Sequence, residues 1–246
     1  MLEGMYAAAA GMAAQQDRLD AISNDVANVN TTGYKRTRVA FRDLVYTDAG
    51  LATQPGVRDG SGAAATFLGR GTAQGALLDS PNPIDVAISG PGYLTVRDAQ
   101  GRQMLTRDGH LQIDGQGRIS TNAGNLLDPA IQLPAGTQAE DVRIAANGSV
   151  MVNNREVGRI NVVNVPAEAG LQAMGNNLFQ ATAASGGTRA AGPGTELVAG
   201  KLEASNADMA DSMTQMVESQ RAFELASKAI QTQDRIAEIA NQVKRI

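Results

Sequence analysis

Hydrophobic positions at the two ends of the chain recur every seven residues, whereas those in the middle alternate with polar ones. Near the N-terminus the seven-residue spacing is followed by Met5, Met12, Leu19 and Val26. Ile22 lies on the neighbouring row of the same pattern. Apolar residues at this interval form a stripe along one face of an α-helix, with the spacing of a coiled coil. The pattern therefore predicts a helix from about residue 2 to residue 29.

The C-terminal segment 207–246 contains neither Gly nor Pro and carries two apolar stripes in succession. The first stripe consists of Met209, Met216, Phe223 and Ile230. A second stripe, which includes Ile236 and Ile239, replaces it further along, so this predicted helix needs partners on more than one side. Ser205 is the expected N-cap of the helix, with Asp208 three residues on in an approximate capping box.

Between the helices the hydrophobic period changes to two, which is typical of β-strands. Asp108–Gly109 and Asn147–Gly148 are examples of the turn signals that separate the short apolar runs. The predicted fold class is therefore α+β, with long N- and C-terminal helices that pack together, coiled-coil-like in an assembly, and a small central all-β domain. The expected division of the chain is a helical segment with a turn (1–46) that pairs with the C-terminal helix (201–246), extended Gly-rich connectors (47–81 and 185–200) and the β domain (82–184).

The composition changes this picture in one respect, the nature of the core. Aromatic residues make up only 3% of the chain, so closely packed Ala-rich helices are favoured over one bulky core. The helical stripes are long and narrow, which favours contacts between copies at least as much as packing within one chain. A net charge of −4 argues against nucleic-acid binding, and no apolar run reaches the eighteen residues of a membrane span.

Candidate chemistry is sparse along the chain. There is no cysteine, and the only histidine, His110, has no second histidine with which to complete a zinc site. The turn at Asp114 lacks the alternating carboxylates of a calcium loop and is expected to be a hairpin. Asp17, Asp20 and Asp25 are expected on the polar, solvent- or subunit-facing side of the first helix. No catalytic, cofactor or metal site is predicted.

The junction after the first helix, with the sequence SNDVANVNTTGYKRTRVAF, contains more polar groups than a helix end requires. Gly33 alone can end a helix, yet Asn24, Asn28 and Asn30 precede it, and asparagine amides compete for nearby backbone groups. The pattern fits either an ordinary helix C-terminus at Gly33 or a junction whose amides bond to another partner. In the assembly implied by the family resemblance described below, the amides would bond to neighbouring copies, and the cations that follow, including Lys35, would meet acidic side chains of adjacent copies.

Three separated motifs, in the expected order, resemble the bacterial flagellar basal-body rod and hook protein family. The first is AISNDVANVNTTGYKRTRVAFRDLVY, from residue 21. The second combines NPIDVAISGPGYLTV with LTRDGHLQIDGQGRIST in the central domain. The third is KLEASNADMADSMTQMVESQRAFELASKAIQTQDRI, from residue 201. Together they cover nearly the whole chain.

This resemblance implies a non-enzymatic subunit of an axial tube. Its terminal segments would be exported unfolded through the flagellar type III apparatus, without a cleaved signal peptide, and would become helical on assembly around a central channel. The implied partners are other copies in a helical polymer, further rod and hook subunits, the export apparatus and surrounding ring proteins. The implied location is the periplasmic part of the basal body, with no membrane insertion.

Within the family the junction and the Gly-rich stretch are most like the distal rod type. A proximal rod type with the same β domain and a hook-related protein are the alternatives, and a secreted trimeric binding module is a more distant one. The expected subunit-interface residues are Met5, Met12, Leu19, Ile22, Val26, Asn24, Asn28, Asn30, Gly33, Met209, Met216, Phe223, Ile230, Ile236 and Ile239.

Overall fold

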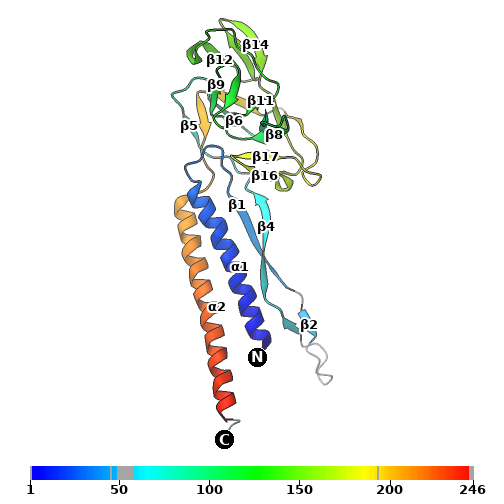
Figure 1. The fold of residues 1–246 in the computed structure, drawn as a ribbon, viewed down its shortest axis with the longest axis vertical. Coiled ribbons are helices and arrows are strands. Elements are labelled where there is room, and N and C mark those ends of the chain that lie inside the picture. The colour runs from blue at the N-terminus through cyan, green and yellow to red at the C-terminus, as the bar shows by residue number, and fades with distance from the viewer. Residues whose placement is uncertain (1, 45, 49–57, 193, 244–246) are drawn as a thin grey trace. The chain divides into compact units, whose positions relative to one another are not determined.

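The structure, a computed structural model, describes residues 2–44, 46–48, 58–192 and 194–243. The chain divides into two compact units (Figure 1). The helical unit comprises Met1–Ala27, Thr37–Leu68 and Asp208–Ile246, and the β-rich unit comprises Asn28–Arg36 and Gly69–Ala207. The fold class is α+β, as predicted, because the N- and C-terminal helices pack together and a β-rich region separates them in the sequence.

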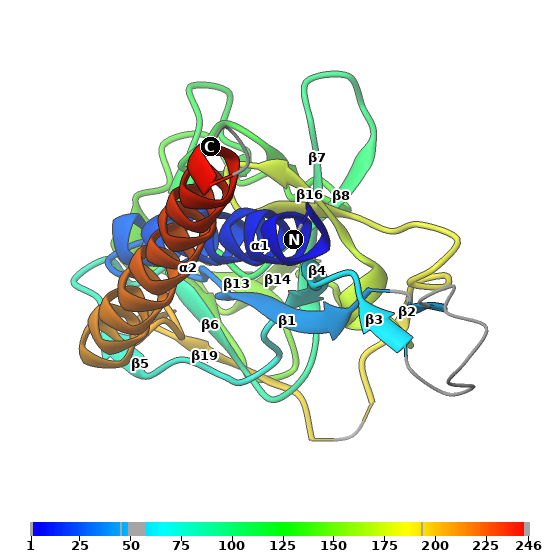
Figure 2. The same ribbon diagram turned by 90° about the horizontal axis from the view of Figure 1, so that it is seen from below.

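The helical unit is built on α1 (Leu2–Ala27) and α2 (Met209–Val243). α1 contacts both α2 and strand β1 (Thr37–Asp43), and it lies between them (Figures 1 and 2). β1 pairs with β4 (Ala63–Arg70). A second pair, β2 (Tyr46–Asp48) with β3 (Arg58–Gly60), is antiparallel.

Small residues and one buried carboxylate attach the strands to α1. A Cβ on Gly62 would lie 2.9 Å from the carbonyl oxygen of Ala7, so only glycine allows this close approach. The Asp25 side chain accepts a hydrogen bond from the Thr37 N–H at 3.0 Å and is only 6% exposed. The expectation that Asp25 lies on the polar side of the helix is therefore wrong, because it binds the backbone of β1 instead.

α2 begins with a different N-cap from the expected one. The Asp208 side chain accepts a hydrogen bond from the Asp211 N–H at 2.9 Å, which is the N-cap-to-N3 contact. Ser205 instead accepts a hydrogen bond from the Ala207 N–H, before the helix starts. Two cap-forming residues lie close together in the sequence, and the one adjacent to the first helical residue, Met209, is the N-cap.

The β-rich unit contains one large sheet and several small ones, and the strand pairings among its described residues are antiparallel. The path of the large sheet runs through β16 (Gln172–Gly175), β17 (Leu178–Gln180), β8 (Gln103–Thr106), β7 (Tyr93–Arg97), β11 (Leu126–Leu127), β10 (Ile119–Thr121) and β9 (Leu111–Ile113). β15 (Val162–Asn164) also pairs with β7, and β18 (Arg189–Ala190) pairs with β15. The smaller sheets are β12 (Val142–Ile144) with β13 (Ser149–Val152) and β14 (Arg155–Arg159), β19 (Glu196–Ala199) with β6 (Val86–Ser89), and β20 (Lys201–Glu203) with β5 (Leu77–Asp79).

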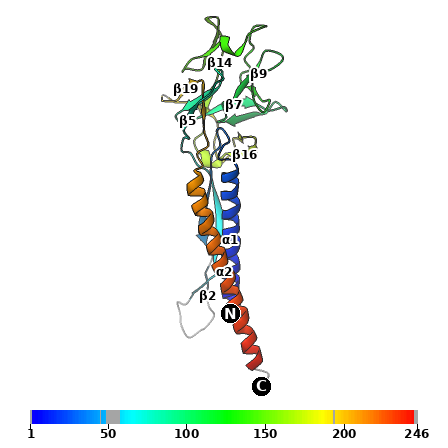
Figure 3. The same cartoon turned by 90° about the vertical axis from the view of Figure 1, so that its left-hand side faces the viewer.

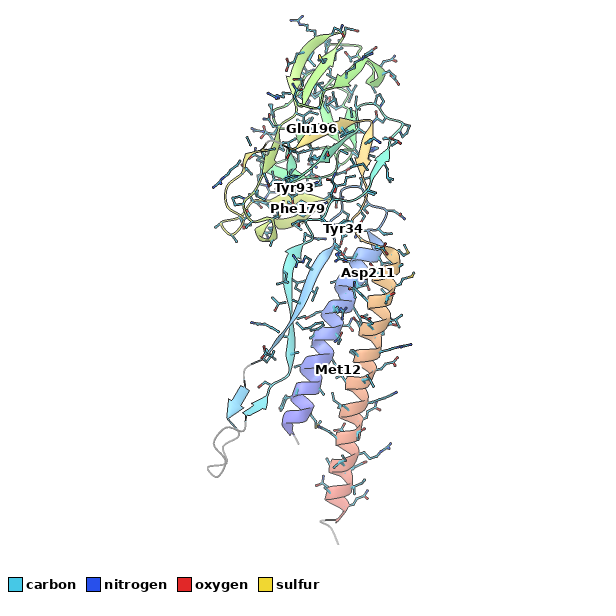
Figure 4. The ribbon with its side chains drawn as sticks, turned by 180° about the vertical axis from the view of Figure 1, so that it is seen from behind. Met12, Tyr34, Tyr93, Phe179, Glu196 and Asp211 are labelled. Carbon is cyan, nitrogen blue, oxygen red and sulfur yellow. The ribbon has the colours of Figure 1, made fainter. Side chains whose placement is uncertain are left out.

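Apolar side chains from these sheets form a well-buried core. Leu94, Leu111 and Val150 are fully buried, although they come from three different strands. Tyr93 and Phe179 pack edge to face in a second, smaller cluster, with ring centroids 5.8 Å apart (Figure 4). The alternation seen in the sequence thus builds a core without tryptophan.

The Gly-rich segments expected to be connectors contain short strands. β3, β4 and β5 lie within residues 47–81, and β18 and β19 lie within residues 185–200. β19 pairs with β6, and β5 pairs with β20. Each Gly-rich segment therefore contributes a strand that forms backbone hydrogen bonds with a strand outside it. Part of the first segment, 49–57, lies outside the described residues.

Candidate assembly surface

The contact between α1 and α2 is a heptad seam in which five of the eight α2 positions are small or polar. On α2 the inward positions alternate in steps of four and three, and they are Ser212, Met216, Ser219, Phe223, Ala226, Ile230, Gln233 and Ala237. On α1, a Cβ at Gly4 would lie 2.5 Å from Nε2 of Gln233. Such positions let helices approach closely, but they bury little apolar surface.

Three buried polar atoms in this unit lack a hydrogen-bond partner within the described part of the chain. They are Oε1 of Gln15, Oγ of Ser219 and Oε1 of Gln233. A buried polar atom without a partner costs about 1–3 kcal/mol. Arg18 lies 3.8 Å from Glu218, an exposed ion pair of small value. The helix pair therefore has a weak interface of its own.

α2 also presents large apolar side chains that its own chain leaves uncovered. Near the start of the helix, Met209, Met213 and Val217 are 41–54% exposed and recur every four residues. Further along, Leu225, Ile236 and Ile239 are 51–67% exposed. Figure 3 shows α2 continuing past the first turn of α1. Exposed apolar rows of this kind mark interaction surfaces.

The structure divides the predicted interface residues into covered and uncovered groups. On α1, Ile22 is buried, and Met5, Met12, Leu19 and Val26 are half-buried (Met12 is labelled in Figure 4). On α2, Met216, Phe223 and Ile230 are half-buried in the seam, whereas Met209, Ile236 and Ile239 are exposed. The role of all of them in contacts between copies stays a prediction. Sequence reasoning missed Met213, Val217 and Leu225, although their spacing from Met209 and Ile236 was a usable signal.

The residues of the predicted joint lie mostly against the β-rich unit of their own chain. Gly33 is buried with φ +66°, and a Cβ there would meet the Arg107 carbonyl carbon at 2.6 Å. The Gly33 N–H donates to the Glu203 carbonyl oxygen at 2.8 Å. Asn28 is half-buried and accepts a hydrogen bond from the Thr31 hydroxyl, whereas Asn24 and Asn30 are exposed. Residues 28–36 therefore form an integral part of the β-rich unit.

A buried charge cluster holds this segment in place. Glu203 is completely buried and lies 2.5 Å from Lys35 Nζ and 3.0 Å from Arg107 Nη1. The Gly75 N–H donates to the same carboxylate at 2.9 Å. Burial lowers the pKa of the Lys35 ammonium, although its hydrogen bond to Glu203 acts in the opposite direction. The expectation that Lys35 meets acidic side chains of adjacent copies is therefore wrong, because its partner lies in the same chain.

A second polar group connects the same segment to the region around His110. The Thr32 hydroxyl donates to Asp108 at 2.8 Å, and the His110 N–H donates to the same oxygen at 3.1 Å. Burial raises the pKa of the Asp108 carboxyl, and these hydrogen bonds oppose the shift. His110 Nδ1 lies 3.4 Å from the buried carboxylate of Asp85. These contacts give the histidine and both carboxylates structural partners.

Two further features bear on the kind of site that is present. Among the described residues, no three His, Asp or Glu side chains gather closely enough to hold a metal ion. Neither described helix combines the length and apolar character needed to cross a membrane.

Three stretches of the chain match known protein families. Residues 5–35 match the family "Flagella basal body rod protein" and residues 198–243 match "Flagellar basal body rod FlgEFG protein C-terminal". Residues 87–152 in the β-rich unit match "Flagellar hook protein FlgE/F/G D1 domain". These matches, together with paired terminal helices that expose apolar rows, define the class of the protein. It is a structural protein of the flagellar rod and hook.

Full-length relatives narrow the class further. A flagellar basal-body rod protein FlgG of Caulobacter vibrioides is 36% identical over 99% of this chain and 100% of its own length. The FlgG protein of Borreliella burgdorferi is 37% identical over the whole of both chains. A FlgF rod protein of Salmonella typhimurium is 28% identical over 96% of both. The chain belongs to the FlgG family of flagellar basal-body rod proteins, and it is a structural rod subunit of the distal type.

Proposed function

We propose that copies of this chain polymerise helically into a hollow shaft that transmits torque and encloses the export channel. The observation that supports this most directly is that α2 exposes two rows of apolar side chains. They lie on a helix whose interface with α1 is weak by itself. A helix with several apolar faces is stable only when further helices cover them. The rod family to which the chain belongs places it in the flagellar basal body, next to other rod and hook subunits.

Several finer features of the function belong to this proposal. The terminal segments pass unfolded through the flagellar type III export apparatus, and they become helical on assembly. The shaft lies in the periplasmic part of the basal body, contacts the surrounding ring proteins and has no catalytic role. The proposed division of labour is that residues 1–46 and 201–246 build the tube, while residues 82–184 form an outer domain.

The proposed contacts between copies use the fifteen interface residues predicted from the sequence. Burying one large apolar side chain contributes about 1.5–3 kcal/mol. Ile236 and Ile239 are the sharpest to test, because they are more than half exposed in the single chain. A change there alters contacts with neighbours without disturbing a core.

The test is the assembly of Ile236→Asp and Ile239→Asp chains in a strain that lacks the wild-type protein. Both variants should be exported but absent from purified basal bodies, and the cells should not swim. Gln231→Asp is the matched control, since Gln231 is exposed, polar and on the same helix. Motile cells with rods of normal length in both variants would contradict the proposal.

A further inference from the structure

The uncovered face of α1 changes character along its length. Tyr6 is 71% exposed, and Ala9 and Ala13 are exposed on the following turns. Asp17 and Asp20 are exposed further along the helix. Steps of three and four residues place all five on one side of the helix. This outer face of α1 is thus small and apolar at its N-terminal end and acidic toward its C-terminal end.

The second apolar row of α2 is flanked by cations and ends in two exposed isoleucines. Its exposed members, in steps of four and three, are Leu225, Ala229, Thr232, Ile236 and Ile239. A row of exposed cations spaced by seven lies beside it, and these are Arg221, Lys228 and Arg235. Two of the cations flank the first half of the row, while Ile236 and Ile239 end it. Arg235 directly precedes Ile236, so cations accompany the whole row, while Ile236 and Ile239 form its apolar end.

The two surfaces have complementary charges that their own chain leaves unpaired. Within the described residues neither Asp17 nor Asp20 forms an ion pair with a cation, and Arg221 and Lys228 form none with a carboxylate. The Gln16 side chain donates to Asp20 at 2.9 Å, which leaves the carboxylate able to accept further partners. Opposite charges on two exposed helix faces favour their association.

The α2 row is also continuous with the seam between α1 and α2. Ala229, Thr232 and Ile236 each directly precede a seam residue, namely Ile230, Gln233 and Ala237. A helix docked on the row would therefore lie alongside the α1–α2 pair and extend the same kind of interface. This continuity indicates a helix as the occupant.

We infer that the Leu225–Ile239 row of α2 docks, antiparallel, on the outer face of α1 in a second copy of the chain. The antiparallel direction brings Ile236 and Ile239 to Tyr6 and Ala9, and it brings Arg221 and Lys228 to Asp17 and Asp20. The parallel direction would bury the two aspartates against the isoleucines, which is unfavourable. The inference rests on the proposed function, and it names which faces meet in the polymer.

The contact is of the kind that allows a chain of subunits to grow. Each copy offers one outer face of α1 and one row of α2, and the two are different surfaces. Such heterologous contacts do not pair off into closed dimers by symmetry and can repeat indefinitely. An isologous contact between two parallel α2 rows would instead place Arg221 and Lys228 near the same residues of the other copy.

Because the chain contains no cysteine, each single-cysteine variant has one thiol. Ala13→Cys and Ala229→Cys chains should be co-expressed, and their purified basal bodies exposed to a mild oxidant. We expect a disulfide-linked dimer that joins residue 13 of one copy to residue 229 of another, identified by mass spectrometry of the linked peptides. Ala13→Cys with Gln231→Cys is the matched control and should give at least tenfold less dimer.

The other outcomes are equally decisive. Rods of the Ala13→Cys and Ala229→Cys chains that link 229 to 229 instead, or Gln231→Cys control rods that give as much dimer, overturn the docking and leave the proposed function intact. If the chain is missing from wild-type basal bodies, the proposed function fails and the docking with it.

A charge reversal gives an independent measurement if the cysteine variants assemble poorly. The double variant Asp17→Lys, Asp20→Lys should reduce the fraction of swimming cells at least tenfold. Adding Arg221→Glu and Lys228→Glu should restore it, because each copy then carries the exchanged pair. Failure of this rescue, with normal export of the chain, contradicts the docking.

Discussion

The helical unit and the β-rich unit use hydrophobic residues in opposite ways. In the β-rich unit, apolar side chains from several strands meet in one core, and Leu94, Leu111 and Val150 are completely buried. In the helical unit, the buried apolar side chains among the described residues are Ala14, Ala21 and Ile22, while larger ones such as Leu225 remain exposed. One unit buries its large hydrophobic side chains within the chain, and the other leaves several of them exposed.

This difference fits the proposed function, in which the chain is first exported and then assembled with other copies. A domain with its own core folds alone, whereas a narrow Ala-rich helix pair needs additional surface to offset its conformational entropy. The following predictions test this contrast, and they are given in order of decreasing effect.

The largest effect is expected from Glu203→Gln in the β-rich unit. The change leaves Lys35 and Arg107 buried beside a neutral side chain, which should lower the free energy of unfolding by about 3–5 kcal/mol. Urea unfolding of the full chain, followed by circular dichroism, measures it. Glu196→Gln is the control, because Glu196 is exposed on β19 (Figure 4) and should change stability little. Equal stability of the two variants would show that the cluster is unimportant.

A pair of truncations compares the two cores directly. Leu111→Ala removes a fully buried side chain and should destabilise the β-rich unit by about 2–5 kcal/mol. Ile230→Ala, in the half-buried helix seam, should leave the same urea transition of the dilute chain unchanged. In assembled rods the order reverses, since Ile230→Ala should lower the temperature at which rods dissociate. A shift of the dilute transition by both variants would argue against the contrast.

A change at the N-cap of α2 should reduce stability by a smaller amount, and a conservative substitution at the same residue serves as the control. Asp208→Ala removes the hydrogen bond to the Asp211 N–H and should destabilise the start of the helix by about 1 kcal/mol. Asp208→Asn keeps an accepting oxygen and should behave nearly as the wild type. Thermal dissociation of rods measures both, and an equal loss in the two variants would assign the effect to charge rather than to the cap.

The smallest effect concerns pH. The pKa of Asp108 is raised above its ordinary value of 3.8 in the folded chain, so the folded state binds more protons there than the unfolded state. Its contribution to stability is complete below pH 3.8 and declines as pH rises through the folded pKa. In Asp108→Asn this decline should disappear, while the amide oxygen still accepts from Thr32 and His110. Urea unfolding at several pH values from acid to neutral would show it, and an unchanged pH slope would contradict it.

Local pattern was sufficient to predict the architecture. The heptads gave both helices, and the alternation with Gly-containing turns gave the β domain, because these signals lie within a few residues of one another. The exposure of apolar side chains on α2 could also be foreseen. The second stripe begins where the first stops, so a single partner helix cannot cover both.

Long-range polar contacts could not be predicted in the same way. Lys35 and Glu203 are separated by most of the chain, and no local pattern tells a buried cation from an exposed one. The same reason made Asp25 look like a surface residue, although it binds the backbone of β1. Partners that are close in space but distant in sequence require the fold itself.

The most direct test of the central claim is amide hydrogen exchange of the full chain, measured once in dilute solution and once in assembled rods. We predict that amides of β7, β8 and β10 are protected in both samples. Those of α1 and α2 should exchange quickly in dilute solution and become protected only in rods. Strong protection of both helices in the dilute chain would contradict the claim that they depend on neighbouring copies.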